Sequence, residues 1–209
     1  MKKAFLITGI GRSGTKFLSN MLNKSTDYKV IHEIEGDSRY VEKPIADKAL
    51  IKRFSRKLYG EVNSYMRFVS QDLNKKINLN TLYILRSPTE IALSCSFRRN
   101  KNKRQKYLNN ISTFIYDYYY FIYNLNLKSN EILLFDKFTS NPEYIIEMEN
   151  FLDINILDKN FIVNNIKKKI NSSERKVSHI SDAYDENSIK KIQRAEELYL
   201  QLRRVACHD

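Results

Sequence analysis

The fold is best predicted from the stretch Phe5-Leu-Ile-Thr-Gly-Ile-Gly-Arg-Ser-Gly-Thr-Lys-Phe-Leu-Ser-Asn-Met-Leu22. Its first three residues and the preceding Ala4 form an apolar run that predicts a short buried strand over 4–7. Glycines stand at 9, 11 and 14, and apolar residues then recur at helical spacing to residue 22. Strand, glycine-rich turn and helix are the layout of a phosphate-binding loop, because glycines allow close backbone approach and N–H groups at the helix start point at the anion. Arg12 and Lys16 add positive charge, so we expect an anion-binding site here.

Composition sets broad limits on the class of protein. The chain has 209 residues, 42% hydrophobic and 29% charged, which is typical of one soluble globular domain over residues 1–209. No run of about 18 apolar residues occurs and no signal peptide is apparent, so we expect no membrane span and a cytoplasmic location. Cys95 and Cys207 lack metal-ligand or disulfide-framework spacing, so we expect neither a metal site nor a disulfide.

The net charge of +12 permits a nucleic acid, an anionic membrane surface or a polyanionic small ligand as partner. A compositional bias toward Lys, Asn, Ile and Tyr accounts for the bulk charge equally well. The sequence lacks an interleaved aromatic and basic RNA-binding motif, and we therefore expect no nucleic-acid partner. Basic residues next to glycine turns and strand ends are more informative about the partner than the total charge is.

Strands alternate with helices along the chain. We expect strands over 4–7, 28–31, 61–70, 81–86 and 131–135, and helices to about 25 and over 46–58, 87–99, 108–126, 142–152 and 185–204. This order predicts an α/β fold, a three-layer sandwich with a central, mostly parallel sheet like that of P-loop nucleoside triphosphate hydrolases. Ligands bind at the carboxyl ends of such strands, so the loop at 9–16, His32-Glu33, Arg86 and Asp136-Lys137 would converge on one crevice.

Glycine spacing alone does not identify the loop. The triphosphatase pattern G-x-x-x-x-G-K-[ST] fits from Gly9 to Gly14, but Thr15 stands in place of its lysine and Lys16 in place of its magnesium-binding hydroxyl. A shift of one residue rotates a helical side chain by about 100°, so Lys16 is no simple substitute. Gly9, Gly11 and Gly14 also match the dinucleotide-binding pattern G-x-G-x-x-G, with Glu33 as the acidic residue that would bind ribose.

The variant Gly-Arg-Ser-Gly-Thr-Lys-Phe-Leu over residues 11–18 resembles the 5′-phosphosulfate loop of the sulfotransferase family. Leu-Arg-Ser-Pro-Thr-Glu-Ile-Ala-Leu-Ser over 85–94 resembles the family's second motif, in which an arginine and a serine eight residues later bind the donor's 3′-phosphate. Arg86 and Ser94 occupy these places. A third stretch, Leu-Leu-Phe-Asp-Lys-Phe-Thr-Ser-Asn-Pro-Glu over 133–143 with Phe-Leu-Asp-Ile at 151–154, also agrees. The resemblance covers residues 4 to 155.

The resemblance implies transfer of a sulfuryl group from 3′-phosphoadenosine 5′-phosphosulfate to a hydroxyl of a carbohydrate or small metabolite, by in-line displacement without a metal. It implies a donor site made of Gly11, Arg12, Ser13, Gly14, Thr15, Lys16, Phe17, Arg86 and Ser94. Backbone N–H groups of residues 13–15, the Thr15 hydroxyl and Arg12 would hold the phosphosulfate. The remaining catalytic candidates are Lys16 and a general base after the second strand, Glu33 first and His32 second, of which only one would reach the site.

Several alternatives stay open. A P-loop kinase or another nucleoside-triphosphate enzyme is the main competing function, and a non-enzymatic nucleic-acid-binding protein is the third. Glu61 and Asn63 are reserve candidates for the base. Residues 171–176 resemble a basic loop that closes over the nucleotide. Four tyrosines of the 108–126 helix would either line an acceptor pocket or pack in the core: Tyr116, Tyr119, Tyr120 and Tyr123.

Overall fold

The computed structural model describes residues 4–96, 104–167 and 179–207. Its contacts divide the chain into two compact units, the first made of Met1–Ile84 with Asn130–Ile170 and the second of Leu85–Ser129 with Asn171–Asp209.

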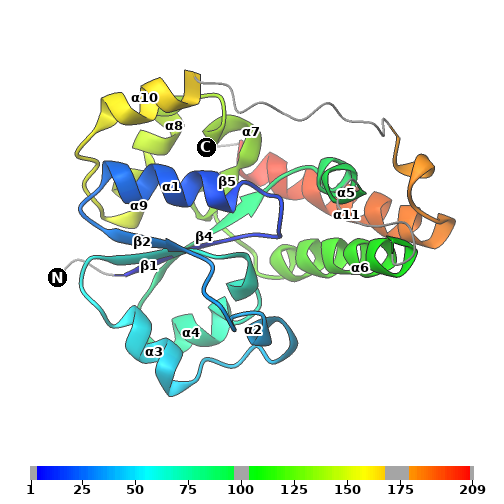
Figure 1. Ribbon diagram of the computed structural model, residues 1–209, viewed down its shortest axis with the longest axis horizontal. Coiled ribbons are helices and arrows are strands. Elements are labelled where there is room, and N and C mark those ends of the chain that lie inside the picture. The colour runs from blue at the N-terminus through cyan, green and yellow to red at the C-terminus, as the bar shows by residue number, and fades with distance from the viewer. Residues whose placement is uncertain (1–3, 97–103, 168–178, 208–209) are drawn as a thin grey trace. The chain divides into compact units, whose positions relative to one another are not determined.

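A five-stranded sheet is the centre of the first unit, and its strands lie in the order β2-β3-β1-β4-β5 (Figure 1). The strands are β1 (Phe5–Thr8), β2 (Lys29–His32), β3 (Tyr59–Val62), β4 (Asn80–Leu85) and β5 (Ile132–Leu134). β1 pairs in parallel with both β3 and β4, and β2 pairs in parallel with β3. The predicted α/β class with a parallel central sheet is confirmed. Four of the five strands match their predicted positions to within one residue at each end, whereas β3 shares only residues 61 and 62 with the predicted segment 61–70.

Helices cover both faces of this sheet, which gives the three predicted layers (Figure 1). One face carries α1 (Thr15–Ser25), α8 (Pro142–Ile146), α9 (Met148–Leu152) and α10 (Lys159–Lys167), and the other carries α2 (Arg39–Glu42), α3 (Lys48–Phe54) and α4 (Ser70–Lys76). Successive side chains of a strand point to opposite faces. Phe5 and Ile7 accordingly pack in the first apolar core, while Leu6 packs in the second.

The second unit is helical. It contains α5 (Pro88–Ser96), α6 (Arg104–Tyr123), a short 3-10 helix (Ile180–Asp182) and α11 (Glu186–Val205), with α11 packed along α5 and α6 (Figure 1). Tyr119 is fully buried, whereas the Tyr120 and Tyr123 side chains are exposed. The core interpretation therefore holds for Tyr119. No helix in the described part of the chain is long and apolar enough to span a membrane.

Some predicted elements differ from the structure. The extended segment predicted over 61–70 ends at Val62, because the Asn63 side chain accepts a hydrogen bond from the Tyr65 N–H and starts the 3-10 helix Ser64–Met66. The single helix predicted over 142–152 is split between α8 and α9, and α10 was not predicted. A 3-10 helix (Ser129–Glu131) and α7 (Phe135–Phe138) flank β5. The basic stretch at 171–176 lies outside the described residues.

Candidate functional site: an anion-binding loop and its surroundings

Gly14 fixes the shape of the loop between β1 and α1. Its φ of 87° lies in the left-handed region, and it is the residue from which α1 begins. A Cβ at this position would lie 2.8 Å from Cε2 of Phe135, so no other residue fits without displacement. At Gly9 a Cβ would lie 2.6 Å from Ser13 Oγ, whereas at Gly11 it would meet nothing within 4 Å. The loop therefore needs glycine at 9 and 14 for its own packing.

Three aromatic rings form the floor beneath Gly14. Phe135 and Phe138 of α7 pack edge to face at 5.5 Å, and Phe17 of α1 stacks on Phe138 at 6.3 Å. Phe17, predicted to bind the donor, thus has its ring in this floor. Lys137 of the predicted Asp136-Lys137 pair lies over the Tyr144 ring at 5.7 Å. The segment after β5 supports the loop mainly through its phenylalanines, which sequence reasoning missed.

The helix start offers the chemistry that an anion needs. No side chain caps α1 and its first turn holds no acidic residue, so the positive end of the helix dipole is not neutralised by its own sequence. Ser13 is fully buried, and its Oγ has no hydrogen-bond partner among the described residues. A buried hydroxyl without a partner is rare and indicates a ligand or water contact. The loop therefore combines a helix start without a side-chain cap with one buried hydroxyl that has no hydrogen-bond partner in the described part of the chain.

The N–H donors of the loop differ from those predicted. The Ser13 N–H donates to the Ile10 carbonyl at 3.1 Å and closes the turn between these residues, so it is not among the donors that face an anion. Arg12 is exposed and has a φ of 76°, a left-handed conformation that costs a non-glycine residue about 1–2 kcal/mol. Lys16, in the first turn of α1, is also exposed. The left-handed backbone strain at Arg12 is typical of functional loops.

His32 and Glu33 both lie beside the loop. His32 Nε2 and Thr15 Oγ1 are hydrogen bonded at 3.1 Å, with the donor set by the imidazole tautomer, and Glu33 Oε1 lies 3.8 Å from His32 Nε2. The expectation that these neighbours point opposite ways is wrong, because the strand ends at His32 and Glu33 turns away from extended geometry with a φ of 39°. The Ser64 hydroxyl donates to Glu33 Oε1 at 2.5 Å. Loop and candidate bases are thus brought together as predicted, with His32 nearer the loop.

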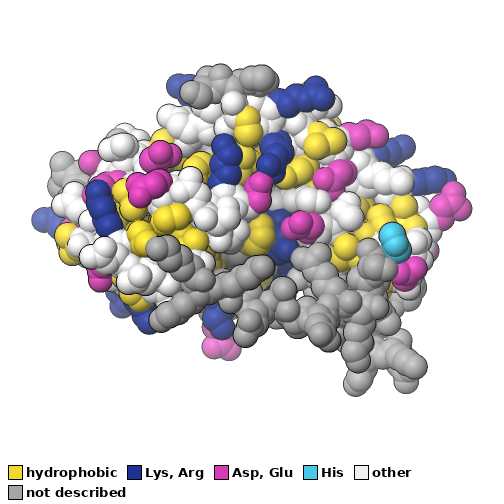
Figure 2. Space-filling model, turned by 90° about the horizontal axis from the view of Figure 1, so that it is seen from above, with side chains coloured by type: hydrophobic (Ala, Val, Ile, Leu, Met, Phe, Trp, Pro, Cys, Tyr) yellow, Lys and Arg dark blue, Asp and Glu magenta, His cyan; other side chains and the backbone are white. Residues whose placement is uncertain are grey.

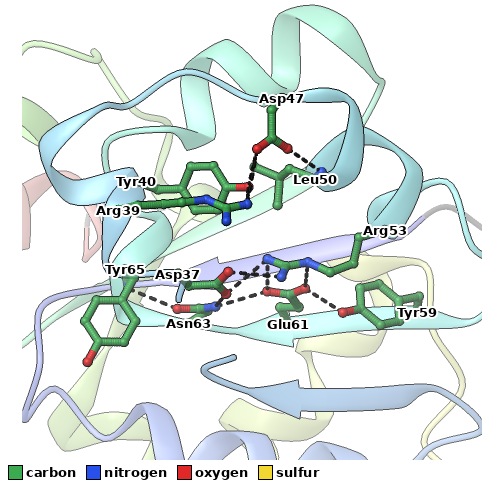
Figure 3. Close-up of polar contacts among 10 residues, drawn as sticks. All are labelled: Asp37, Arg39, Tyr40, Asp47, Leu50, Arg53, Tyr59, Glu61, Asn63 and Tyr65. Carbon is green, nitrogen blue, oxygen red and sulfur yellow. Dashed lines mark hydrogen bonds and ion pairs between the residues drawn. The ribbon is translucent and has the colours of Figure 1, made fainter. Parts of the chain in front are cut away.

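A buried polar network fixes the chain that follows Glu33 (Figure 3). Arg53 of α3 forms a two-point contact with Asp37, at 3.0 and 3.1 Å. It also pairs with Glu61: its Nη2 donates to Glu61 Oε2 at 3.2 Å, and its Nε lies 2.7 Å from Glu61 Oε1. The Asn63 amide donates to Asp37 Oδ2 at 2.7 Å and to Glu61 Oε2 at 3.1 Å. The Tyr59 hydroxyl donates to Glu61 Oε1 at 2.5 Å. Through Asp37, the loop after β2 is attached to β3 and α3.

The same network shows why Glu61 and Asn63 are unsuitable as the reserve bases. Both are fully buried, and their polar atoms are used by the partners just named. Burial raises the pKa of Glu61 above its ordinary value even though the Arg53 charge opposes this shift. Burial lowers the pKa of Arg53, but its hydrogen bond to Asp37 and the charge of Glu61 outweigh that effect and leave the pKa raised. These residues attach the segment after β2 to β3 and α3, a role that no sequence motif predicts.

Arg86, predicted to bind a 3′-phosphate, belongs to the second unit and directly follows β4. Its Nε lies 3.0 Å from Glu90 Oε2, and its side chain is 12% exposed. The Tyr119 hydroxyl donates to the Arg86 carbonyl and accepts from the Arg86 N–H at 3.2 Å. Ser94 is half-buried on α5. The predicted helix start at Ser87-Pro88 is confirmed, and the tyrosine that holds Arg86 was not predicted in that role.

Comparison of the sequence with protein-family models and with curated proteins finds no match. Charge is spread rather than concentrated on the face drawn in Figure 2, where Lys and Arg side chains among the coloured residues are separated by Asp, Glu and hydrophobic groups. A continuous basic stripe, the feature that nucleic-acid binding would favour, is not seen among the described residues of this face.

Proposed function

We propose that this chain is a sulfotransferase that uses 3′-phosphoadenosine 5′-phosphosulfate and has a P-loop-like variant of the α/β fold. The observation that carries the proposal is the loop after β1, which ends in an uncapped helix start beside a buried Ser13 hydroxyl without a partner in the described chain. That arrangement fits a sulfated phosphate, since it offers neutral donors and a helix dipole to a compact anion. The sulfotransferase-like motifs around Arg12 and Arg86 specify which anion.

The loop residues have separable roles in this proposal. N–H groups at the start of α1, Ser13 Oγ and the Arg12 guanidinium bind the phosphosulfate and stabilise charge that develops on the leaving phosphate oxygen. Lys16 adds a second cation at the same helix start. The donor supplies an activated sulfuryl group, and displacement by an acceptor hydroxyl releases the nucleotide. Arg86 and Ser94 are assigned to the 3′-phosphate on the sequence motif alone.

We assign the role of general base to His32, with Glu33 as its orienting carboxylate. His32 Nε2 is the titratable atom in contact with the loop, at 3.1 Å from Thr15 Oγ1. Glu33, at 3.8 Å, would stabilise the imidazolium that forms when His32 accepts the proton of the acceptor hydroxyl. This reverses the order of preference that the sequence suggested. The acceptor is proposed to be a hydroxyl of a carbohydrate or small metabolite.

Calorimetric titration with 3′,5′-bisphosphoadenosine in magnesium-free buffer tests the proposal. We expect saturable binding to the wild-type chain, and binding about 10- to 100-fold weaker to Arg12→Ala, because a hydrogen bond from a charged group is worth about 1.5–3 kcal/mol. Lys52→Ala is the matched control, since Lys52 is an exposed cation of the same unit, on α3. Its affinity should equal that of the wild type.

Three results would contradict the proposal. Binding of ATP only, and only with magnesium, would favour a P-loop kinase or related nucleoside-triphosphate enzyme. Salt-sensitive binding to generic DNA or RNA that survives Arg12→Ala, with no response to the bisphosphate, would favour nucleic-acid binding. Equal losses in Arg12→Ala and Lys52→Ala would show that the ligand responds to net charge rather than to the loop.

A further inference from the structure

One carboxylate of α11 holds the start of α5. Glu196 Oε2 accepts hydrogen bonds from the Ser87 hydroxyl at 3.0 Å, the Thr89 N–H at 3.0 Å and the Thr89 hydroxyl at 2.9 Å. Thr89 follows Pro88, the first residue of α5, so its N–H has no partner within that helix. Glu196 thus caps α5 from a distant part of the sequence and saturates one of its own oxygens in doing so.

The same face of α11 also supports the backbone of Arg86. Tyr199, three residues after Glu196, packs edge to face against Tyr119 of α6, with ring centres 6.1 Å apart. The Tyr119 hydroxyl in turn bonds both the N–H and the carbonyl of Arg86. Tyr119 stays protonated and able to donate, because burial raises its pKa above the ordinary value.

These contacts constrain Arg86 on both sides. Tyr119 fixes its backbone, and Glu90 in the first turn of α5 holds its Nε at 3.0 Å. Glu90 keeps this position only while α5 begins at Pro88, and the Glu196 cap stabilises that start. Ser94 lies on the same helix, so its spacing from Arg86 depends on the same start.

We propose that Glu196 and Tyr119 are positioning residues for Arg86, and that α11 thereby sets the preference of this protein for a nucleotide with a 3′-phosphate. The inference rests on the proposed function, because it takes Arg86 and Ser94 as the 3′-phosphate ligands. It assigns a role in the donor site to the C-terminal helix, to which no sequence motif points. Neither residue needs to touch the ligand.

The preference for the 3′-phosphate is the measurement that tests this inference. The ratio of the Kd for adenosine 5′-monophosphate to the Kd for 3′,5′-bisphosphoadenosine isolates the 3′-phosphate, since the two ligands share everything else. We expect Arg86→Ala to remove most of the wild-type ratio and Glu196→Ala to lower it about tenfold, the equivalent of about 1.4 kcal/mol. Glu196→Gln should recover most of the ratio, because its amide oxygen still accepts hydrogen bonds.

Two further variants separate positioning from general stability. Glu197→Ala is the matched control, because Glu197 is the adjacent exposed acid on α11, and its ratio should equal that of the wild type. Tyr119→Phe keeps the buried ring and removes only the hydroxyl, so it should lower the ratio even if Glu196→Ala fails to fold. All titrations should be carried out at a temperature at which circular dichroism shows each variant to be folded.

The outcomes distinguish this inference from the proposed function. If the wild type prefers the bisphosphate and Arg86→Ala abolishes the preference, but Glu196→Ala and Tyr119→Phe keep it and merely melt earlier, the two residues are structural and the inference is overturned. If the wild type binds neither nucleotide, or shows no preference that depends on Arg86, the proposed function fails and the inference falls with it.

Discussion

Two segments of this chain are proposed to bind phosphate groups, and they are built by different means. The loop between β1 and α1 owes its shape to backbone conformation, with a left-handed Gly14 above the Phe135 ring. The segment from Arg86 to the start of α5 owes its shape to side-chain hydrogen bonds from Tyr119 and Glu196. The loop is one continuous stretch of the sequence, whereas the Arg86 segment depends on a hydrogen bond from Ser87 to Glu196, 109 positions away.

The difference shows two ways to shape an anion site: through backbone conformation, or through side chains that distant residues hold in place. A backbone-built loop presents neutral donors that do not titrate, and its geometry fails when a Cβ is added. A side-chain-built segment places a permanent charge, and its geometry fails when a distant hydroxyl or carboxylate is removed. Variants of Gly14 and Arg12 test the backbone-built loop, and a variant of Glu61 tests the polar network beside it.

Gly14→Ala should have the largest effect on stability. The added Cβ would lie 2.8 Å from the Phe135 ring at a φ of 87°, so left-handed strain and overpacking add, and we expect a loss of about 2–4 kcal/mol in the free energy of unfolding. Gly11→Ala is the matched control, because a Cβ there meets nothing within 4 Å, and its stability should change by less than about 0.5 kcal/mol. Urea denaturation measures both, and equal stabilities would show that the backbone does not set this loop.

The polar network beside the loop should make stability depend on pH. The pKa of Glu61 is raised in the folded state, chiefly by burial, so folded chains bind more protons than unfolded chains above the ordinary value of 4.5. The contribution of Glu61 is therefore fully present below that value and is lost as pH rises through the raised pKa. As pH rises over this range, the free energy of unfolding of the wild type should therefore fall relative to that of Glu61→Gln.

Glu42→Gln serves as the control for that titration. Glu42 is an exposed carboxylate at the end of α2 in the same unit, so its variant should follow the wild-type pH profile in parallel. A wild-type advantage over Glu61→Gln that grows with pH would contradict the direction of the shift. It would mean that the pairing with Arg53 outweighs burial at this carboxylate.

Local features of the fold and site were readable from the sequence, and features joined by tertiary contacts were not. The strand before Gly9 and the helix after Gly14 follow from hydrophobic periodicity and glycine placement, and both are present. The network of Asp37, Arg53 and Glu61 joins three separate segments, and no residue spacing along the chain predicts it. The floor beneath Gly14 also comes from a distant segment, α7.

The candidate base shows the same limit. Period-two alternation predicted that His32 and Glu33 point to opposite sides, which is correct only for residues inside a strand. The strand ends at His32, and the φ of 39° at Glu33 turns its carboxylate to within 3.8 Å of the imidazole. A sequence pattern cannot locate the end of a strand to within one residue. Here the exact end, at His32, decides whether the His32 imidazole and the Glu33 carboxylate lie close together.

Arg12 gives the smallest expected change in stability and the sharpest test of the backbone-built loop. Its φ of 76° is a conformation that glycine adopts without cost, so the chain retains an arginine where glycine would relieve strain. Arg12→Gly and Arg12→Ala both remove the guanidinium, and only the alanine variant keeps the strain. We expect the glycine variant to equal or exceed the alanine variant in unfolding free energy by up to about 1 kcal/mol. Both should lose affinity for 3′,5′-bisphosphoadenosine to the same extent, which calorimetry measures. Should the alanine variant bind as tightly as the wild type, the strained arginine would have no part in anion binding, and the loop would act through its backbone and Ser13 alone.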